Sequence, residues 1–393
     1  MKIVHIITRL ILGGAQENTL ITCRLLAGRG HDVTLITGPA IGPEGQLFDK
    51  TENENYKVIV IDKMFRQISP SDDFKAYRQL KSVLKEIKPD IVHTHSAKAG
   101  ILGRYAAHAL KKRSKDNKPK VVHTIHGLAF HPYQSKRLNK FYIAIEKLAA
   151  KRTDAIICVA DTMTEKALAA GIAKREDYTT AYSAIEEEAY LAEVEERKIN
   201  DFRRKHAIST NAVVLVTIAR LAELKGHEYI IESAKRLVSE FPNCMWLLVG
   251  DGHLAEQIKH EIQMANLGHR FRFTGLIDPS EIPLAIRSSD ILVHCSLREG
   301  LARALPQGML AGKPAISFDI DGAKEVVNEN TGRLIPPEDV DALTEASREL
   351  IADKELRQKL GENARRSVVK QFAPETMVDT IEGVYRQILP DYE

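Results

Sequence analysis

Short apolar runs alternate with helical stretches along almost the whole chain, and this alternation limits the fold more than any other feature of the sequence. The runs are rich in Val and Ile, and they are continuous rather than interrupted at every second residue by polar side chains. Continuous runs of this kind are typical of strands in a parallel sheet whose two faces are covered by helices. The sequence therefore predicts an α/β protein with doubly wound parallel sheets.

The alternation comes in two series separated by a charged stretch. Residues 183–211 carry many charges and no strand pattern, so a linker and a first helix are expected there. A chain of 393 residues is long enough for two such halves. Predicted strands cover residues 2–7, 31–36, 58–61, 90–93, 121–124 and 155–159 in the first half, and 213–218, 245–249, 271–274, 291–294, 314–318 and 331–335 in the second. Helical patterns cover residues 15–29 and 74–87 and much of 338–389.

Charge is almost balanced over the whole chain but is concentrated in one segment. A net charge of +3, without a nucleic-acid-binding motif, argues against a nucleic-acid partner. Residues 104–152, however, hold 13 Lys and Arg residues against two acidic ones, Asp116 and Glu146. This segment is either a solvated face that keeps the protein soluble or a patch for an anionic partner, namely acidic lipid headgroups or a diphosphate.

Cysteine usage and hydropathy favour a cytoplasmic protein. The four cysteines are isolated, so neither a disulfide framework nor a zinc site is expected. No run of 18 apolar residues exists, so no membrane span is expected, and the first ten residues resemble a strand more than a signal peptide. We therefore expect a cytoplasmic location, and the basic segment leaves open a peripheral position at the inner face of a membrane.

A pair of glycines, Gly13-Gly14, separates the first predicted strand from the first helix. Glycines at this position let the backbone approach a ligand phosphate, and the helix N-terminus supplies N–H groups and a positive dipole end. A tight turn without a ligand is the alternative. The G-x-G-x-x-G fingerprint is absent, and Thr37-Gly38-Pro39 stands where a dinucleotide-binding acid would follow the second strand. A nicotinamide or flavin dehydrogenase is therefore a poor fit.

The second half carries an ordered set of polar and glycine-rich motifs at strand ends and helix starts, which is where open α/β sheets bind ligands. Arg220 and Lys225 lie five residues apart in one predicted loop, so both can address a single diphosphate. Gly300, Leu301 and Ala302 precede a helix and are expected to add backbone N–H donors. The full set consists of Arg220, Lys225-Gly226, Gly250-Asp251-Gly252, Gly275-Leu276, Glu299-Gly300-Leu301-Ala302-Arg303, Gln307 and Gly312-Lys313-Pro314.

This order of motifs closely resembles the donor half of the retaining GT-B glycosyltransferases of family 4. In the first half, Leu12-Gly13-Gly14-Ala15-Gln16 is similar to the N-terminal glycine loop of that family. The stretches around His93-Thr94-His95 and His123-Thr124-Ile125-His126-Gly127 resemble the subgroup that extends polyprenyl-diphosphate-linked or exopolysaccharide sugars. The resemblance covers essentially the whole chain.

The resemblance implies a GT-B fold, in which two Rossmann-like domains face a central cleft. Residues 1–187, together with a returning C-terminal helix at 375–393, would bind the acceptor, and residues 188–374 would bind the donor. It implies a UDP-sugar, in preference to a GDP-sugar, as donor, a glycan or lipid-linked sugar as acceptor, and no metal or other cofactor. The implied catalytic residues are His126, Glu299, Arg220 and Lys225; the donor-binding residues are Gly13, Gly14, Arg220, Lys225, Gly250, Leu276, Gly300, Leu301, Ala302, Arg303 and Gln307; and the acceptor-side residues are Gln16, His95 and Lys98.

Two features bear on the nucleotide site. The family signature has a second Glu eight positions after the first, but here Glu299 is followed by Gln307, so the usual ribose contact is altered. Asp319-Ile320-Asp321 is a D-x-D string of the kind that binds a divalent metal in other glycosyltransferases. Because Gly322 follows it directly, an Asp-Gly turn after a strand is the preferred interpretation.

Three other classes of protein would keep the same donor motifs. A GT-B epimerase or hydrolase of nucleotide sugars would need acidic residues in the first half and would release free nucleotide without an acceptor. A phosphorylase would need a lysine linked to pyridoxal phosphate, which absorbs visible light. A non-catalytic nucleotide-sugar binder would show no turnover, and Gln307 is the residue that raises this alternative.

Overall fold

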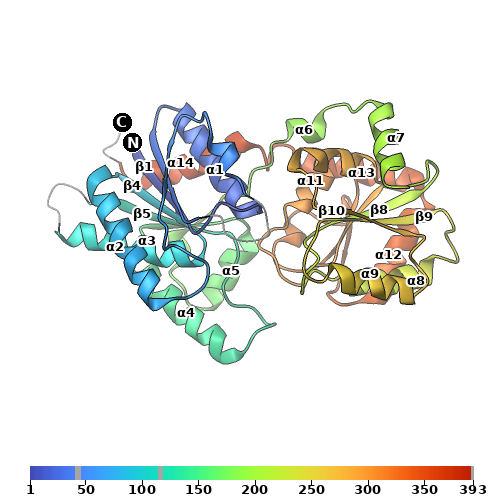
Figure 1. The fold of residues 1–393 in the computed structure, drawn as a ribbon, viewed down its shortest axis with the longest axis horizontal. Coiled ribbons are helices and arrows are strands. Elements are labelled where there is room, and N and C mark those ends of the chain that lie inside the picture. The colour runs from blue at the N-terminus through green and yellow to red at the C-terminus, as the bar shows by residue number, and fades with distance from the viewer. Residues whose placement is uncertain (40–45, 114–117, 391–393) are drawn as a thin grey trace. The chain divides into compact units, whose positions relative to one another are not determined.

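The computed structural model describes residues 1–39, 46–113 and 118–390, and it divides into two compact units (Figure 1). The first unit comprises Met1–Ala184 together with Ala373–Glu393, and the second comprises Ile185–Phe372. Each is built around one all-parallel sheet covered by helices, so the doubly wound α/β fold predicted from the apolar runs is confirmed. Within the described residues, no helix combines the length and the apolar character needed to cross a bilayer.

The first unit contains a seven-stranded sheet in the order β3-β2-β1-β4-β5-β6-β7. The strand order reverses direction between β1 and β4, and this reversal creates the switch point at which such sheets bind ligands. The strands are β1 (Lys2–Ile7), β2 (Asp32–Thr37), β3 (Lys57–Val60), β4 (Ile91–His95), β5 (Lys120–Ile125), β6 (Ala155–Cys158) and β7 (Tyr178–Thr180). The helices are α1 (Gly14–Gly28), α2 (Pro70–Ile87), α3 (Ala97–Arg113), α4 (Lys136–Ala150), α5 (Asp161–Ala169) and α14 (Pro374–Ile388).

Alternate residues of β1 enter two separate cores of this unit. Ile3 and Ile7 pack with α1 and α14 on one face of the sheet, whereas Val4 and Ile6 pack with α2 and α3 on the other. His5 lies between Ile3 and Ile7 in the sequence, so it belongs to the face covered by α14. A polar side chain is thus placed in an otherwise apolar layer.

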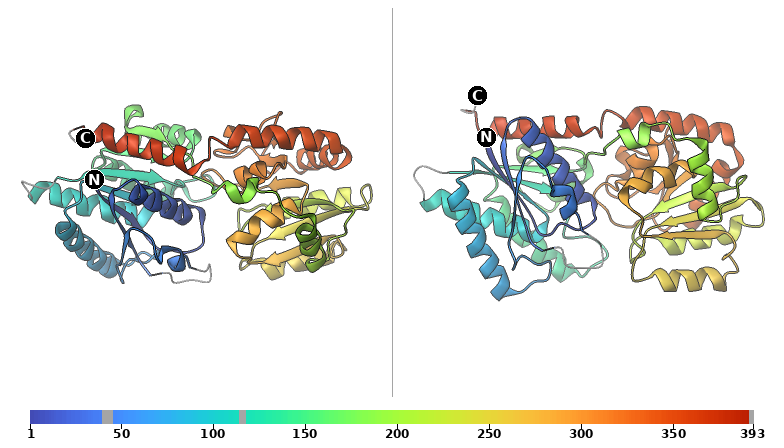
Figure 2. Two further views of the ribbon diagram at one scale, coloured as in Figure 1. Left: turned by 90° about the horizontal axis from the view of Figure 1, so that it is seen from above. Right: turned by 45° about the horizontal axis from the view of Figure 1, so that its top comes forward.

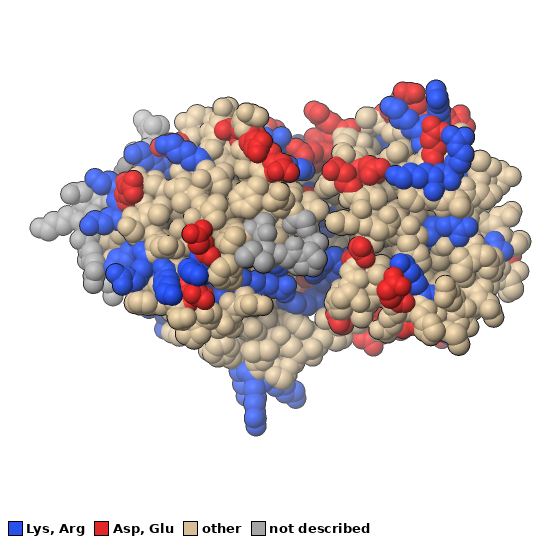
Figure 3. All heavy atoms as spheres, in the orientation of Figure 1, with Lys and Arg blue, Asp and Glu red and all other residues tan. Residues whose placement is uncertain are grey.

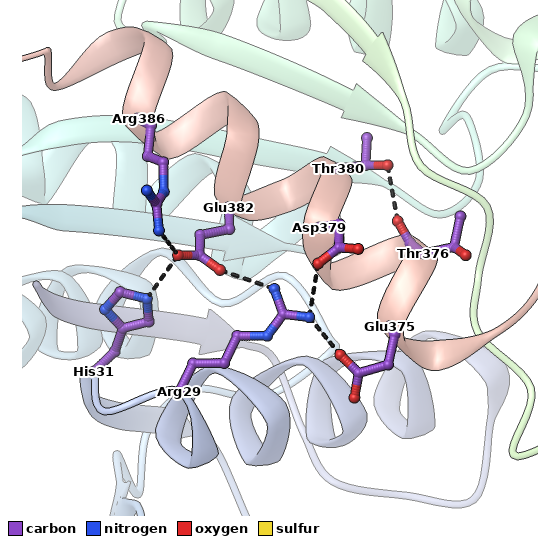
Figure 4. Close-up of polar contacts among 8 residues, drawn as sticks. All are labelled: Arg29, His31, Glu375, Thr376, Asp379, Thr380, Glu382 and Arg386. Atoms are coloured by element: carbon purple, nitrogen blue, oxygen red, sulfur yellow. Dashed lines mark hydrogen bonds and ion pairs between the residues drawn. The ribbon is translucent and has the colours of Figure 1, made fainter.

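The C-terminal helix α14 is fastened to the first unit by apolar packing and by a cluster of charges. Tyr385, fully buried, packs in the same core as α1, and Figure 2 shows the red helix running along the first sheet. At its surface, the Arg29 guanidinium pairs with Glu375, with Asp379 at 2.8 Å and with Glu382 at 2.8 Å (Figure 4). Residues more than 340 positions apart in the sequence are joined in this way.

The second unit contains a six-stranded sheet in the order β10-β9-β8-β11-β12-β13, with its switch point between β8 and β11. The strands are β8 (Val213–Ile218), β9 (Cys244–Val249), β10 (Phe271–Gly275), β11 (Ile291–His294), β12 (Ala315–Phe318) and β13 (Gly332–Ile335). The helices are α6 (Glu188–Leu191), α7 (Glu196–Lys205), α8 (His227–Leu237), α9 (Ala255–Met264), α10 (Ile282–Arg287), α11 (Ala304–Leu310), α12 (Val340–Ala352) and α13 (Lys354–Val368).

Candidate active site

In the second unit, the loops that follow β8 and β11 meet at the switch point. The Leu297 N–H donates to the Leu224 carbonyl at 2.9 Å. Gly226 has a φ of 73°, and a Cβ at this position would lie 2.0 Å from the Cys295 carbonyl oxygen. Only glycine allows this close approach, so the Lys225-Gly226 pair joins the two loops and places the Lys225 side chain where they meet.

Lys225 forms an ion pair with Glu299, and the carboxylate is only partly exposed, at 23% of its side chain. The His294 imidazole, buried at the end of β11, lies 3.7 Å from the same Glu299 oxygen. Burial raises the pKa of Glu299, but the His294 imidazole and the Lys225 charge outweigh burial and hold this pKa at about 2. Glu299 is therefore a fixed anion at neutral pH, held against a fixed cation.

The D-x-D string forms part of the support beneath Glu299. Asp321 has a left-handed φ of 46°, and its carboxylate accepts the backbone N–H of Glu299 at 2.7 Å. The Gly322 N–H donates to the Gly300 carbonyl at 3.0 Å. The Asp321 carboxylate thus holds the loop that carries Glu299 in place.

Other predicted donor residues occupy the surrounding loops in different ways. Gly250, with a φ of 135°, packs so closely that a Cβ would lie 2.1 Å from the Ala219 carbonyl oxygen, which explains a glycine there without a ligand. Leu276 is exposed, at 57%. Arg220 is exposed, and among the described residues no ion pair or hydrogen bond engages its side chain. Gln307 is half-buried in α11.

Leu301 and Ala302 are buried just before α11. Their backbone N–H groups donate to no acceptor within the described parts of the chain. Gly300 is buried beside them, and Arg303, half-buried, is the N-cap residue of α11. The structure therefore brings Lys225, Glu299 and the 300–303 segment to the same edge of the second sheet.

The Gly312-Lys313-Pro314 motif does not belong to this edge, contrary to the expectation that every motif of the second half lies at the carboxyl ends of strands. It precedes β12 and so lies at the opposite end of that strand. A Cβ at Gly361 of α13 would be 2.0 Å from the Gly312 carbonyl oxygen, and Arg365 donates to the Leu310 carbonyl at 3.0 Å. Burial lowers the pKa of Lys313 to about 8. The motif packs α11 against α13.

In the first unit, the loop after β1 meets the start of α3 at the switch point. The Thr8 hydroxyl hydrogen-bonds the Ser96 hydroxyl at 2.7 Å, and Ser96 adopts a left-handed φ of 61°. Gly13 and Gly14 open α1 in the same loop. A Cβ at Gly13 would meet the Gln16 amide oxygen at 2.8 Å, so Gly13 leaves room for that side chain.

His126 follows β5, is partly exposed and lines a pocket of about 260 Å³. The pocket also contains His123 and the Glu146 carboxylate, with apolar walls from Leu128, Phe130 and Ile172. Arg104, only 1% exposed, donates to Glu146 at 2.7 Å and to the Gly100 carbonyl at 2.9 Å. A buried guanidinium thus orients a carboxylate in the pocket.

Two of the expected acceptor-side residues have other partners. His95 is 1% exposed; its Nδ1 lies 3.1 Å from His126 Nε2 and its Nε2 lies 2.9 Å from His5 Nδ1, so it lies behind His126 instead of at a surface. Lys98 is 12% exposed and pairs with Asp73 at 2.5 Å. Both residues therefore have partners within the first unit, and their place on the acceptor side stays a prediction.

His5, Arg104 and Glu146 were not predicted as site residues. His5 stands inside an apolar strand, and only the in-register pairing of β1 with β4 brings it to His93 and His95. Arg104 and Glu146 come from α3 and α4, 42 positions apart. A lone polar residue in an apolar strand was the available signal for His5. No sequence pattern signals the Arg104–Glu146 pair.

Family models and relatives assign the chain to a class of enzymes. A model described as "Glycosyltransferase Family 4" matches residues 12–188, and one described as "Glycosyl transferases group 1" matches residues 198–367. The chain belongs to the GT-B glycosyltransferases of family 4, as the motif order had indicated, and it is a glycosyltransferase.

Individual relatives agree with this assignment. The chain is 30% identical, over 98% of its length and 96% of the relative, to the UDP-Gal:alpha-D-GlcNAc-diphosphoundecaprenol alpha-1,3-galactosyltransferase of Escherichia coli. It is 23% identical, over 90% of both chains, to the capsular polysaccharide biosynthesis glycosyltransferase CapM of Staphylococcus aureus. The fold matches that of Alr3699/HepE from Anabaena in complex with UDP, with a TM-score of 0.81 and 20% identity over 98% of this chain and 100% of the other.

Proposed function

We propose that the protein is a retaining, metal-independent glycosyltransferase that moves a hexose or N-acetylhexosamine from a nucleotide sugar to a sugar hydroxyl of a glycan or lipid-linked acceptor. The observation that carries the proposal is the Lys225–Glu299 pair near the Leu301 and Ala302 amides, which find no acceptor among the described residues. A UDP-sugar is favoured over a GDP-sugar as donor because the name of the Escherichia coli relative specifies UDP-Gal and HepE was crystallised with UDP.

The chemical difficulty in this reaction is the departure of a nucleoside diphosphate, on which negative charge grows as the glycosidic bond breaks. Preorganised cations and N–H groups stabilise such charge without a metal. In this proposal Arg220 supplies a planar fork of donors, Lys225 a point charge, and residues 301 and 302 backbone N–H groups. Because Glu299 already holds the Lys225 side chain in place, binding of the diphosphate costs no further conformational entropy of this side chain.

Glu299 orients the donor sugar through its ionised carboxylate, which accepts hydrogen bonds from sugar hydroxyls. The acceptor hydroxyl attacks from the face that the diphosphate leaves, and the departing phosphate takes the proton of that hydroxyl. His126, in the first unit, hydrogen-bonds the hydroxyls of the transferred sugar. This course retains the anomeric configuration.

Two assays test the proposal directly. Activity should persist in excess chelator, because the cations are side chains; loss in chelator with recovery on adding Mn²⁺ or Mg²⁺ would contradict metal independence. An α-linked donor should give an α-linked product, read from the anomeric coupling constant by NMR. A β-linked product would exclude retention.

Donor and acceptor classes are tested by incubating the protein with a panel of UDP- and GDP-sugars and analysing products by mass spectrometry. Free nucleotide released equally with and without acceptor would favour the epimerase or hydrolase alternative. Nucleotide binding without turnover with any acceptor would favour the non-catalytic binder.

A membrane-bound acceptor is supported by the surface of α4, which contains the exposed apolar side chains Leu138, Phe141 and Leu148. Exposed Lys and Arg side chains lie among them, without ion pairs within the described residues: Lys136, Arg137, Lys140 and Lys147. Figure 3 shows basic side chains at the lower margin of this unit, where Figure 1 draws α4. We propose that α4 contacts an anionic bilayer.

A further inference from the structure

Three imidazoles form a hydrogen-bonded line that begins at His126 and runs into the core of the first unit. His126 Nε2 lies 3.1 Å from His95 Nδ1, and His95 Nε2 lies 2.9 Å from His5 Nδ1. His95 and His5 are 1% and 0% exposed, on β4 and β1, respectively. Both nitrogens of His95 are therefore used, one by each neighbouring histidine.

The directions of the two hydrogen bonds are coupled. Burial, with the charges of neighbouring histidines, lowers the pKa of His95 well below its usual range, and burial lowers the pKa of His5 to about 3, so each ring is neutral and carries one proton. If His5 donates from Nδ1, His95 must accept at Nε2 and donate from Nδ1, and His126 must accept at Nε2. In the opposite arrangement every donor and acceptor is exchanged.

The far end of the line decides between the two arrangements. His5 Nε2 is buried and has no hydrogen-bond partner in the described parts of the chain. Orphaned buried N–H donors are rarer in proteins than under-satisfied acceptors. His5 therefore keeps its proton on Nδ1, where His95 accepts it, and leaves only a lone pair at Nε2.

We propose that His5 and His95 are positioning residues that hold His126 in the tautomer with its proton on Nδ1. Since the Nε2 lone pair is occupied by His95, His126 serves the transfer reaction as a hydrogen-bond donor and not as a general base. This assignment rests on the proposed function for its catalytic meaning, whereas the tautomer itself follows from the line of histidines alone.

A metal site is the competing interpretation of the same histidines, because ring nitrogens of His5, His93 and His95 all lie within 4.8 Å of one another. His93, however, has both nitrogens occupied, by the Tyr385 hydroxyl at 2.5 Å and the Thr124 hydroxyl at 2.6 Å. The rings of His93 and His95 are also stacked on each other, with centroids 4.3 Å apart. A metal would have to displace these bonds.

The tautomer is tested by nitrogen NMR on the whole protein labelled with ¹⁵N-histidine. Comparison with His126→Gln assigns the His126 signals among the 14 histidines. We expect a protonated, pyrrole-type Nδ1 and an unprotonated, pyridine-type Nε2. The reverse pattern would overturn the proposal, and a joint change of the His5, His93 and His95 signals on adding Zn²⁺ would favour the metal site instead.

Two substitutions of His95 separate positioning from mere packing. His95→Asn keeps an amide near the Nδ1 position, facing His126, whereas His95→Gln places its amide near the Nε2 position, facing His5. We expect His95→Gln to lower kcat by about 10- to 100-fold with little change in donor KM, as outer-shell partners of functional histidines do. His95→Asn should remain within about threefold of the wild type.

His93→Gln is the matched control, because it removes a buried histidine on the same strand whose two ring nitrogens hydrogen-bond Tyr385 and Thr124. It should lower the melting temperature without moving the His126 signals. Equal losses of kcat in His95→Asn and His95→Gln would overturn the positioning role. If the wild type transfers no sugar from any donor, the proposed function fails, and the NMR comparison of the wild type with His95→Gln still decides the tautomer.

Discussion

Lys225 stabilises the Glu299 carboxylate, whereas Arg220 forms no ion pair within the described residues. Loss of Lys225 should therefore affect stability as well as activity, and loss of Arg220 should affect activity alone. Arg220→Ala or Lys225→Ala should lower kcat by roughly 10²–10³, the effect of removing one preorganised charge donor. Lys225→Ala should also raise the pKa of Glu299 and lower the melting temperature, because a half-buried anion loses its partner.

Steady-state kinetics and calorimetry on both variants test this prediction. Arg220→Ala serves as the stability control, since the Arg220 side chain is exposed and forms no ion pair or hydrogen bond within the described residues. Turnover like that of the wild type in either variant would remove that residue from the diphosphate site.

Gln307 stands where the resemblance implies a second Glu, and the chemistry of its amide predicts weaker nucleotide binding. A carboxylate accepts from two adjacent ribose hydroxyls, whereas an amide has one acceptor oxygen and an NH₂ that must donate. Neutral hydrogen bonds contribute about 0.5–1.5 kcal/mol and those to charged groups about 1.5–3. Gln307→Glu should therefore tighten UDP severalfold in a calorimetric titration. Unchanged or weaker binding would mean that position 307 does not face the ribose.

At the scale of elements, α14 is held to α1 by a carboxylate whose ionisation is required for the contact. Burial raises the pKa of Glu382, but hydrogen bonds from Arg386 and Arg29 outweigh it and hold the pKa at about 2 (Figure 4). The unfolded chain binds its proton near the ordinary value of 4.5, so this stabilisation is complete above that pH and is lost as the pH falls towards 2.

Glu382→Gln should lower the free energy of unfolding by about 1.5–3 kcal/mol at pH 7 and by much less near pH 2. Thermal unfolding of the wild type and variant across this range measures the difference. Glu299 titrates in the same range in both proteins, so subtraction isolates Glu382. Glu375→Gln, at an exposed partner of the same arginine, is the control and should change little. A constant difference at every pH would contradict the linkage.

Most strands could be predicted from the apolar runs, because strands buried on both faces consist mainly of apolar residues. The predicted strands at 2–7 and 213–218 coincide with β1 and β8, and 245–249 misses only the first residue of β9. β7 was missed because it has three half-buried residues, Tyr178–Thr180, at the edge of the sheet. The Gly312-Lys313-Pro314 motif was predicted at the wrong end of β12. The order of motifs along the chain does not say at which edge of the sheet each motif lies.

The candidate site was predicted unevenly, for a physical reason. Lys225 and Glu299 were both predicted at the donor site, because both follow strands that flank the switch point, but the ion pair between them was not predicted. The burial of His95 could not be foreseen, because a histidine at a strand end can point to solvent or into the core. The outcome depends on the helix that covers this face of the strand, and the residue of α14 that bonds His93, two positions before His95, comes 292 positions later in the sequence.

At the scale of the whole molecule, the structure shows which basic side chains of the segment 104–152 are available to a membrane and which are not. Arg104 is buried against Glu146, and Lys111 pairs with Asp154 at 2.5 Å, so these two are not available to a membrane. The side chains of Lys112, Arg113 and Lys115, in the same segment, lie outside the described residues. The exposed cations of α4, interleaved with Phe141 and Leu148, are the better candidates.

We expect the protein to co-sediment with vesicles that contain anionic lipid, through apolar insertion and charge together. Each Lys near the surface contributes about 1 kcal/mol at low salt, and this contribution is screened as ionic strength rises. Lys140→Gln with Lys147→Gln should therefore weaken binding mainly at low salt. Phe141→Ser with Leu148→Ser should weaken it at every salt concentration, because burial of apolar area does not depend on screening. Arg197→Gln with Lys198→Gln, on the exposed helix α7, changes the net charge equally and should have little effect. If all three double variants bind as the wild type does, α4 does not contact the bilayer.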